Sequence, residues 1–304
     1  MILYLGIVPG LFPHIEEQTI LKKMKELNSG LIFSYWAFRK FLPKIISKGV
    51  HDFFSYKGPI MIDSGAYSAF NMGISISCED YANFLMKIDL RPKDKIINLD
   101  LIGNSQKSYS NWKYLSKMID TSIIPVLHFP EIDSNYPNCK IIGLGGMVPS
   151  LKINQPGSIY NVGKWVALIN FKNPCKEYHG FGIGSPFNQI IFGDYLSSLD
   201  WIGWRRNAAV CECYTPEGSK TIMKARNKPS KRSSLNQSLF DQYKPPFIEN
   251  FDLLAFPGTI GWKYRALWNV WWFLNCQKWQ AVIDQSKYVR SMKQIMRQSI
   301  QIKD

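Results

Sequence analysis

The sequence is short of acidic residues, of long apolar runs and of cysteines at a framework spacing. Its 304 residues carry 37 Lys and Arg against 23 Asp and Glu, a formal net charge of +14. The six cysteines are scattered, which is typical of reduced thiols in a cytosolic protein. The apolar start has no basic residue before Lys22 and does not resemble a signal peptide, and the uncharged aromatic run at 266–277 is too short to cross a bilayer. We therefore expect a cytoplasmic protein without membrane association.

The surplus positive charge is concentrated in the last third of the chain. Residues 205–304 carry 17 Lys and Arg against 7 Asp and Glu, whereas residues 1–204 carry 20 against 16. A field of this kind attracts polyanions, although a solvated, Lys-rich surface without a ligand would have the same composition. The basic, polar stretch 220–234 contains Pro229 and is predicted to be a mobile loop that orders when a partner binds.

Short apolar runs recur along the first two thirds of the chain, at 2–8, 31–35, 60–63, 96–100, 123–128, 141–145, 179–183 and 199–204. Segments long enough for a crossover helix lie between most of them, at 18–27, 37–48, 78–88, 110–119, 164–170 and 187–198. Apolar strands that alternate with helices indicate a parallel sheet covered on both faces. Eight repeats favour a (β/α)8 TIM barrel over an open sheet, with a short crossover at 129–140.

The chain is thus predicted to have a catalytic barrel at 1–208 and a basic C-terminal region at 209–304. Within that region, residues 261–299 have a helical pattern rich in tryptophan and other aromatic residues. Helical aromatic residues predict packing, here against the outer wall of the barrel. Stacking of a minority of them on bases or ribose is the alternative.

Polar residues, glycines and one aromatic residue stand at or near the ends of the predicted strands, at Asp63, Asp100, His128, Gly145, Gly146, Phe181 and Asp200. In a barrel these strand ends converge on one face. A single Asp after a strand is often a helix N-cap, but three on one rim suggest chemistry. A pair of carboxylates suits displacement at an anomeric carbon, in which one attacks and the other transfers the proton. The glycine-rich ends at 142–147 and 180–184 would let a flat ligand lie against the backbone, with Phe181 and Met147 on either side of it.

Four segments resemble, in order, the motifs of the tRNA-guanine transglycosylase family. The sequence DSGAY at 63–67 is similar to DSGGF, and GGMV at 145–148 is similar to GGLAV. The sequence GFGIG at 180–184 is similar to LMGVG, and DWIGWRRNA at 200–208 resembles DCVLPTRNA with the same spacing from Asp to Arg. The resemblance covers residues 60–208, and its specificity comes from the order of the motifs on consecutive strands.

This resemblance implies a base-exchange reaction. Asp200 matches the aspartate that opens the last motif, so it is implied to be the nucleophile that attacks C1′ and releases guanine. Asp63 is implied to be the general acid and base, and Asp100 the acceptor for N1–H and the exocyclic amine of the base. The other implied base contacts are Ser64, His128 near the position of a family glutamine, Gly145, Gly146, Met147 and Phe181.

The departures from the family concern its structural zinc, which is held by CxCxxC and a downstream histidine. Here Cys211 and Cys213 have no third cysteine beside them and all four histidines lie upstream, so we expect no metal and no cofactor. The missing zinc site, the short chain and the DWIGWR sequence resemble the DNA-directed branch, the 7-deazaguanine DNA transglycosylases of phages and bacterial DNA-modification clusters. The implied partners are DNA and a free 7-deazaguanine base. A monomer or weak homodimer is expected, because the tRNA enzymes dimerise partly through the zinc region.

Basic residues downstream of Asp200 are predicted to clamp the phosphates around a base that is flipped or presented single-stranded. They are Arg205, Arg206, Lys224, Arg226, Lys228, Lys231 and Arg232. Three alternatives stay open at this point: the same exchange on tRNA, a glycoside hydrolase that uses Asp63 and Asp200 as its carboxylate pair, and a nucleic-acid-binding protein without catalytic activity.

Overall fold

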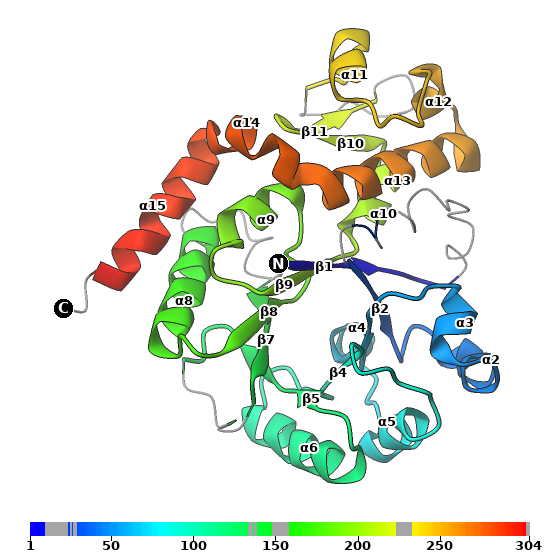
Figure 1. The fold of residues 1–304 in the computed structure, drawn as a ribbon, viewed down its shortest axis with the longest axis vertical. Helices are drawn as coiled ribbons and strands as arrows, with labels where there is room; N and C mark the ends of the chain where they lie inside the picture. Colours follow the sequence, from blue (N-terminus) through cyan, green and yellow to red (C-terminus); the bar gives the residue numbers. More distant parts are fainter. Residues whose placement is uncertain are drawn as a thin grey trace.

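The structure is a computed structural model that describes residues 1–9, 24, 26, 29–132, 136, 139–147, 158–222 and 233–301. Its centre is one parallel sheet in the order β5-β4-β3-β2-β1-β9-β8-β7-β6 (Figure 1). The strands are β1 (Ile2–Gly6), β2 (Gly30–Ser34), β3 (Ile60–Asp63), β4 (Lys95–Ile97), β5 (Ile123–Ile124), β6 (Val126–His128), β7 (Ile141–Gly145), β8 (Glu177–Gly180) and β9 (Ser198–Trp201). Each of the eight predicted apolar runs overlaps a strand.

The sheet curls into a nearly closed barrel, because its two end strands are consecutive in the chain. Only Pro125 separates β5 from β6, and proline has no N–H to give to a ladder. Its carbonyl still accepts a hydrogen bond from Gly143 N at 2.8 Å, while Ile124 O accepts one from Asn98 N at 2.9 Å. The sequence predicted one strand at 123–128 and eight in all. Among the described residues the central sheet has nine, because this run is divided at the proline.

Helices surround the barrel (Figure 1). They are the short η1 (Arg39–Phe41), then α2 (Leu42–Lys48), α3 (Val50–Phe54), α4 (Ala66–Asn71), α5 (Cys78–Leu85), α6 (Ser105–Met118), α8 (Ser158–Lys172), α9 (Pro186–Phe192) and α10 (Gly203–Ala209). Ser77, Asn104 and Ser185 cap α5, α6 and α9, each accepting a backbone N–H with its side chain. The predicted crossover helix at 18–27 lies almost wholly outside the described residues, and each of the other five predicted segments overlaps a helix.

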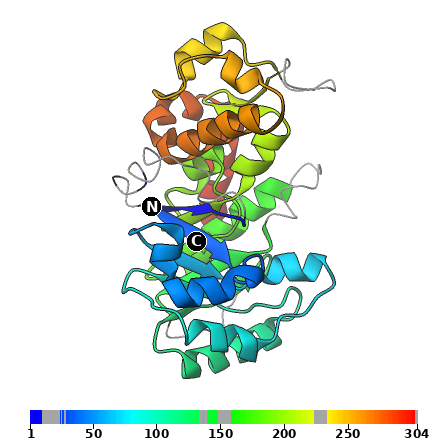
Figure 2. The same ribbon diagram turned by 90° about the vertical axis from the view of Figure 1, so that its right-hand side faces the viewer.

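After α10 the chain builds a lobe on one side of the barrel (Figures 1 and 2). It contains the antiparallel hairpin β10 (Glu212–Thr215) and β11 (Gly218–Thr221), then α11 (Gln237–Tyr243), α12 (Asp252–Ala255), α13 (Gly258–Asn275), η3 (Cys276–Trp279), α14 (Gln280–Asp284) and α15 (Lys287–Gln301). The predicted loop at 220–234 is partly corrected, because Lys220 and Thr221 belong to β11 and Ser234 forms a bridge with Thr221. Residues 223–232 of that loop lie outside the described part.

The helix α13 joins this lobe to the barrel. Arg265 Nε donates to Ala208 O at 2.9 Å, and Asn269 Nδ2 donates to Trp204 O at 3.3 Å, both on α10. Farther along the chain, α15 packs on α8, where Gly163 gives room to Met292 and Met296. Within the described residues, the structure contains no helix long and apolar enough to span a bilayer.

The core has two layers, which follow from the alternation of side chains along each strand. On β1, Leu3 and Leu5 face the helices, whereas Tyr4 faces the barrel interior. The inner cluster comprises Tyr4, Ile32, Met61, Ile97, Ile124 and Val126, and it fills the barrel interior. Two residues beyond Met61 and Val126 on the same strands stand Asp63 and His128. The polar side chains therefore begin where the apolar filling of the barrel ends.

Candidate active site

Asp63 ends β3, where the chain turns sharply into α4. Its neighbour in register is Ser34 of β2. The turn needs Gly65, which has φ +84° and whose added Cβ would collide with Ser34 and Trp36. Gly65 N donates to Asp63 Oδ2 at 3.1 Å. Asp63 is therefore a partly buried carboxylate that is held by the turn that follows it.

Burial raises the pKa of Asp63 to about 7, and the negative charges of Asp100 and Asp200 add to this effect. Hydrogen bonds from the backbone of Gly65 and Ser64 oppose the rise without cancelling it. The three carboxylates found at separate strand ends in the sequence thus act on one another in the folded chain. At neutral pH, Asp63 exists in both its acid and its base form.

Asp100 is paired with His128, so that the pair joins the ends of β4 and β6. It lies in the loop after β4, and its Oδ2 is 2.7 Å from Nε2 of His128, the last residue of β6. His128 stands opposite Gly145, where an added Cβ would come within 2.9 Å of the His128 ring carbon Cδ2. Burial by itself lowers the pKa of His128, but the hydrogen bond and charge of Asp100, together with Glu131, outweigh it and raise that pKa. The glycine therefore makes the room that the Asp–His pair occupies.

Asp200 has two partners, one on β8 and one in the loop between β8 and α9. Its Oδ1 accepts a hydrogen bond from Gly182 N at 2.8 Å and lies 3.3 Å from His179 Nε2. The Asp100 and Asp200 side chains are 13% and 11% exposed, so each keeps a narrow opening to solvent. Both carboxylates are thus oriented by the protein and still reachable by a small ligand.

His179 is the site residue that the sequence prediction missed. It was treated only as the start of an apolar run, although it is completely buried and contacts Asp200. One signal could have identified it, since a histidine two residues before Phe181 faces the same side of its strand. Its partner across the sheet, Ser198, is set by strand register, which no local pattern gives.

Phe181 and Met147 do not lie on either side of a common space. The Phe181 ring packs edge-on against the His179 ring, with 4.6 Å between the ring centroids. It occupies the space that a side chain at Gly143 would need and packs against the inner cluster of the barrel. Met147 is completely buried in the core between strands and helices. The predicted pair of side chains around a flat ligand is therefore absent from this structure, and Met147 keeps only its backbone for such a contact. Gly146, with φ +72°, precedes it.

Ser64 and the first two predicted phosphate-binding arginines lie close to the strand ends in sequence. Ser64 is buried, and its hydroxyl accepts a hydrogen bond from Ala66 N at 3.3 Å. Arg205 and Arg206 are exposed on α10, which is pinned to β1 by a 2.9 Å hydrogen bond from Trp204 Nε1 to Gly6 O. The other predicted phosphate contacts lie outside the described residues; they are Lys224, Arg226, Lys228, Lys231 and Arg232.

Cys211 and Cys213 flank the start of the hairpin and are both buried. Burial raises the pKa of the Cys213 thiol far above its usual range. Both cysteines belong to the hydrophobic cluster around Trp268. Among the residues that the structure describes, no group of three or more His, Cys, Asp or Glu side chains could hold a metal ion.

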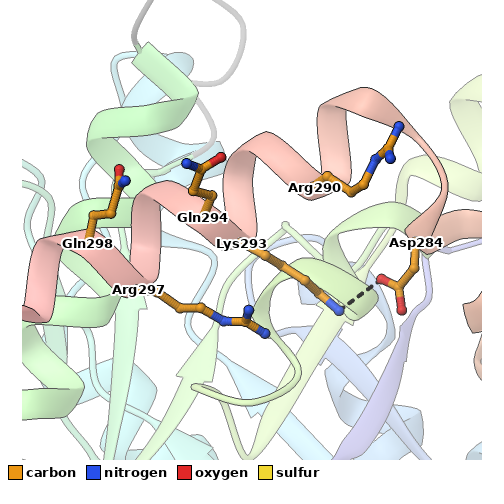
Figure 3. A pocket seen from close by; sticks show the side chains of 6 residues that line it. All are labelled: Asp284, Arg290, Lys293, Gln294, Arg297 and Gln298. Carbon is orange, nitrogen blue, oxygen red and sulfur yellow. Dashed lines mark hydrogen bonds and ion pairs between the residues drawn. The ribbon is translucent and has the colours of Figure 1, made fainter.

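A cavity of about 530 Å³ lies elsewhere, along α15 (Figure 3). It is lined by Asp284, Arg290, Lys293, Gln294, Arg297 and Gln298. Lys293 Nζ is 2.9 Å from Asp284 Oδ1, while Arg290 and Arg297 are exposed. None of these residues follows a barrel strand, so the cavity is separate from the carboxylate site.

A scan against protein-family models gives no match to this sequence, and a search of curated proteins gives none either. The family resemblance therefore depends on the four sequence motifs alone.

Proposed function

We propose that this protein is a transglycosylase on a (β/α)8 barrel, in which β5 and β6 count as one strand bent at Pro125. It exchanges guanine in DNA for a free 7-deazaguanine base through a covalent aspartyl-glycosyl intermediate. The observation that carries the proposal is that the three carboxylates have different surroundings. Asp100 and Asp200 each have a histidine partner, whereas burial and the charges of these two raise the pKa of Asp63 to about 7.

The first half of the reaction uses Asp200 as nucleophile. A carboxylate oxygen of Asp200 bonds to C1′ while the bond from C1′ to N9 of guanine breaks and its electron pair goes to the base. The acid form of Asp63 gives a proton to the departing guanine. The products are free guanine and an ester between Asp200 and the sugar.

The second half reverses these steps with a different base. The base form of Asp63 takes the N9 proton of the incoming 7-deazaguanine, whose N9 bonds to C1′ as the ester bond breaks and its electron pair returns to Asp200. A single group that first donates and then accepts a proton works best when its pKa is near the working pH. A pKa of about 7 meets that requirement at neutral pH.

Asp100 is proposed to read the base edge. A carboxylate oxygen has room for more than one donor, so Asp100 can keep its bond to His128 and still accept N1–H and the exocyclic amine of guanine. The same edge is present on a 7-deazaguanine, which explains how one site accepts both the leaving and the entering base. The backbone at Gly145 and Gly146 would lie beside that base.

The charge of the protein and the depth of the site support a nucleic acid as the partner. Asp200 is largely buried at the end of β9, so a base inside a duplex must be flipped, or presented single-stranded, before its C1′ can reach Asp200. Arg205 and Arg206 are exposed on the next helix, and we propose that they contact flanking phosphates. The net charge of +14 favours such a polyanion.

The deciding experiment incubates the protein with DNA or tRNA, each with labelled guanine or an unlabelled 7-deazaguanine, and analyses the nucleosides by mass spectrometry. We expect incorporation into DNA only. Incorporation into tRNA only would assign the reaction to the tRNA enzymes. Release of guanine without incorporation would indicate a hydrolase, and binding without either reaction would indicate a nucleic-acid-binding protein.

A further inference from the structure

His179 is a buried histidine for which the proposed reaction has so far no role. It lies on β8, its side chain is 0% exposed, and both of its ring nitrogens have polar partners. Nδ1 is 2.9 Å from Ser198 Oγ, and Nε2 is 3.3 Å from Asp200 Oδ1. Because a buried polar ring without partners is costly, this arrangement fixes where the ring can sit.

The ring orientation is also fixed by packing. The rings of Tyr4 and Phe181 both pack edge-on against the His179 ring, with distances between ring centroids of 5.8 Å for Tyr4 and 4.6 Å for Phe181. His179 and Ser198 are direct neighbours in the register of β8 and β9, and Ser198 shares its strand face with Asp200. The three side chains are therefore held by the sheet itself.

Both donors to the Asp200 carboxylate reach the same oxygen. Gly182 N and His179 Nε2 both contact Oδ1, which leaves Oδ2 as the free oxygen among the contacts of the described residues. For Nε2 to donate a proton, Nδ1 of a neutral ring must accept one, so the Ser198 hydroxyl has to be the donor to Nδ1. The Asp200 carboxylate can only accept, so it selects the Nε2–H tautomer of His179, and the Ser198 hydroxyl satisfies Nδ1 in that tautomer.

We propose that His179 is a positioning residue that anchors Oδ1 of Asp200 and so assigns Oδ2 as the atom that bonds to C1′. This inference rests on the proposed function. As the bond from Oδ2 to C1′ forms and the bond from C1′ to N9 breaks, Oδ1 becomes the carbonyl oxygen of the ester. In the second half, the electron pair of the ester bond returns to the carboxylate. Nε2–H and Gly182 N–H then stabilise the charge that develops on Oδ1.

The same three residue types occur in hydrolases with a serine nucleophile, but the arrangement here points to a different role. Ser198 stands two residues before Asp200, deeper in the barrel, and is itself buried. In those hydrolases Nε2 of the histidine faces the serine, whereas here Nε2 faces the carboxylate. Ser198 therefore orients His179, and Asp200 remains the nucleophile.

Two amide variants of His179 form a matched pair for the test. The amide of His179→Gln extends to the position of Nε2 and can still donate to Asp200, whereas the shorter His179→Asn reaches only the position of Nδ1. We expect kcat for exchange to fall by about 10²-fold in His179→Asn, with the KM for DNA unchanged, because one preorganised donor is removed. We expect His179→Gln to recover most of this rate. Equal rates in the two variants, or a change in KM alone, would overturn the positioning role.

A serine variant and a spectrum complete the experiment. Ser198→Ala should lower kcat by no more than His179→Asn does, because Ser198 acts only through His179, and a larger loss would instead favour a serine nucleophile. The ¹⁵N spectrum of the histidine rings should show His179 as the Nε2–H tautomer in the unmodified protein, and a lasting Nδ1–H tautomer would overturn the proposal without any activity being measured. If the unmodified protein shows the Nε2–H tautomer but exchanges no base in any nucleic acid, the proposed function fails while the anchoring of Oδ1 stands.

Discussion

Asp100 Oδ2 and His128 Nε2 lie 2.7 Å apart, and this contact joins the loop after β4 to the end of β6. The two strands are separated in the sheet by β5, which is continuous with β6 except for Pro125. The pair therefore spans the place where the ends of the sheet meet. It also gives the proposed base-reading carboxylate a fixed orientation before any ligand arrives.

Removal of Asp100 should impair base recognition. Asp100→Ala loses two charge-assisted hydrogen bonds to the base edge, each worth about 1.5–3 kcal/mol, so kcat/KM for exchange should fall by about 10²- to 10⁴-fold. Steady-state kinetics with the free base as variable substrate measures this decrease. An unchanged kcat/KM for the base would remove Asp100 from the recognition role.

His128 should make the stability of the protein depend on pH. Its pKa is raised in the folded state, so its pairing with Asp100 stabilises fully below the unfolded pKa, about 6.5, and this stabilisation is lost as pH rises through the folded pKa. The variant His128→Gln should therefore lower the unfolding temperature more at pH 6 than at pH 9. Thermal unfolding at the two pH values tests this, and equal decreases would contradict it.

Removal of the Asp63 carboxylate should stabilise the protein, because the pKa of Asp63 is raised by burial and by two negative charges. Its folded pKa of about 7 exceeds the ordinary value of 3.8, so ionisation opposes folding increasingly from about pH 4 to pH 7 and by a constant amount above that. Asp63→Asn should thus raise the unfolding temperature relative to the unmodified protein, by an amount that grows over this range and then stays level. The same variant should lose exchange activity at every pH. A stabilisation that is independent of pH would show that the Asp63 carboxyl is not perturbed.

Much of this site could be predicted because its residues follow strands that the apolar pattern indicates. Asp63 comes after three apolar residues and before a glycine that the turn requires, so its place was evident. His179 was missed, because its role depends on the register between β8 and β9 and on a contact with the neighbouring strand. Met147 was misplaced, because the turn at Gly146 directs its side chain into the outer core.

The same distinction between local and long-range information applies to the fold. The apolar runs predicted parallel strands, and the division of 123–128 follows from the missing N–H of Pro125. The sequence did not predict the strand β11, because its second half belongs to a basic, polar segment. This strand is stabilised by pairing with β10 and by the 2.9 Å ion pair between Lys220 Nζ and Glu217 Oε2. Pairing partners of this kind are set by tertiary structure.

Arg205 and Arg206 should contribute to DNA binding through phosphates. The logarithm of the DNA-binding constant falls linearly with the logarithm of the salt concentration. Changing both residues to Gln should make this decrease less steep, by about 0.7–0.9 in the slope for each phosphate that the protein no longer neutralises. The matched control changes Arg290 and Arg297 to Gln, which removes the same charge from exposed positions on α15 (Figure 3). Fluorescence anisotropy over a range of salt concentrations compares the two. A slope that changes equally in both variants would indicate a general effect of surface charge.

The bond between Asp200 and the sugar is the centre of the proposed mechanism. Mixing the protein with guanine-containing DNA in the absence of any other base, quenching under denaturing conditions and measuring the intact mass tests it most directly. We expect a protein–DNA adduct that maps to Asp200, that forms with release of one guanine, and that is absent from Asp200→Asn. Base exchange by Asp200→Asn, or an adduct on another residue, would contradict the mechanism.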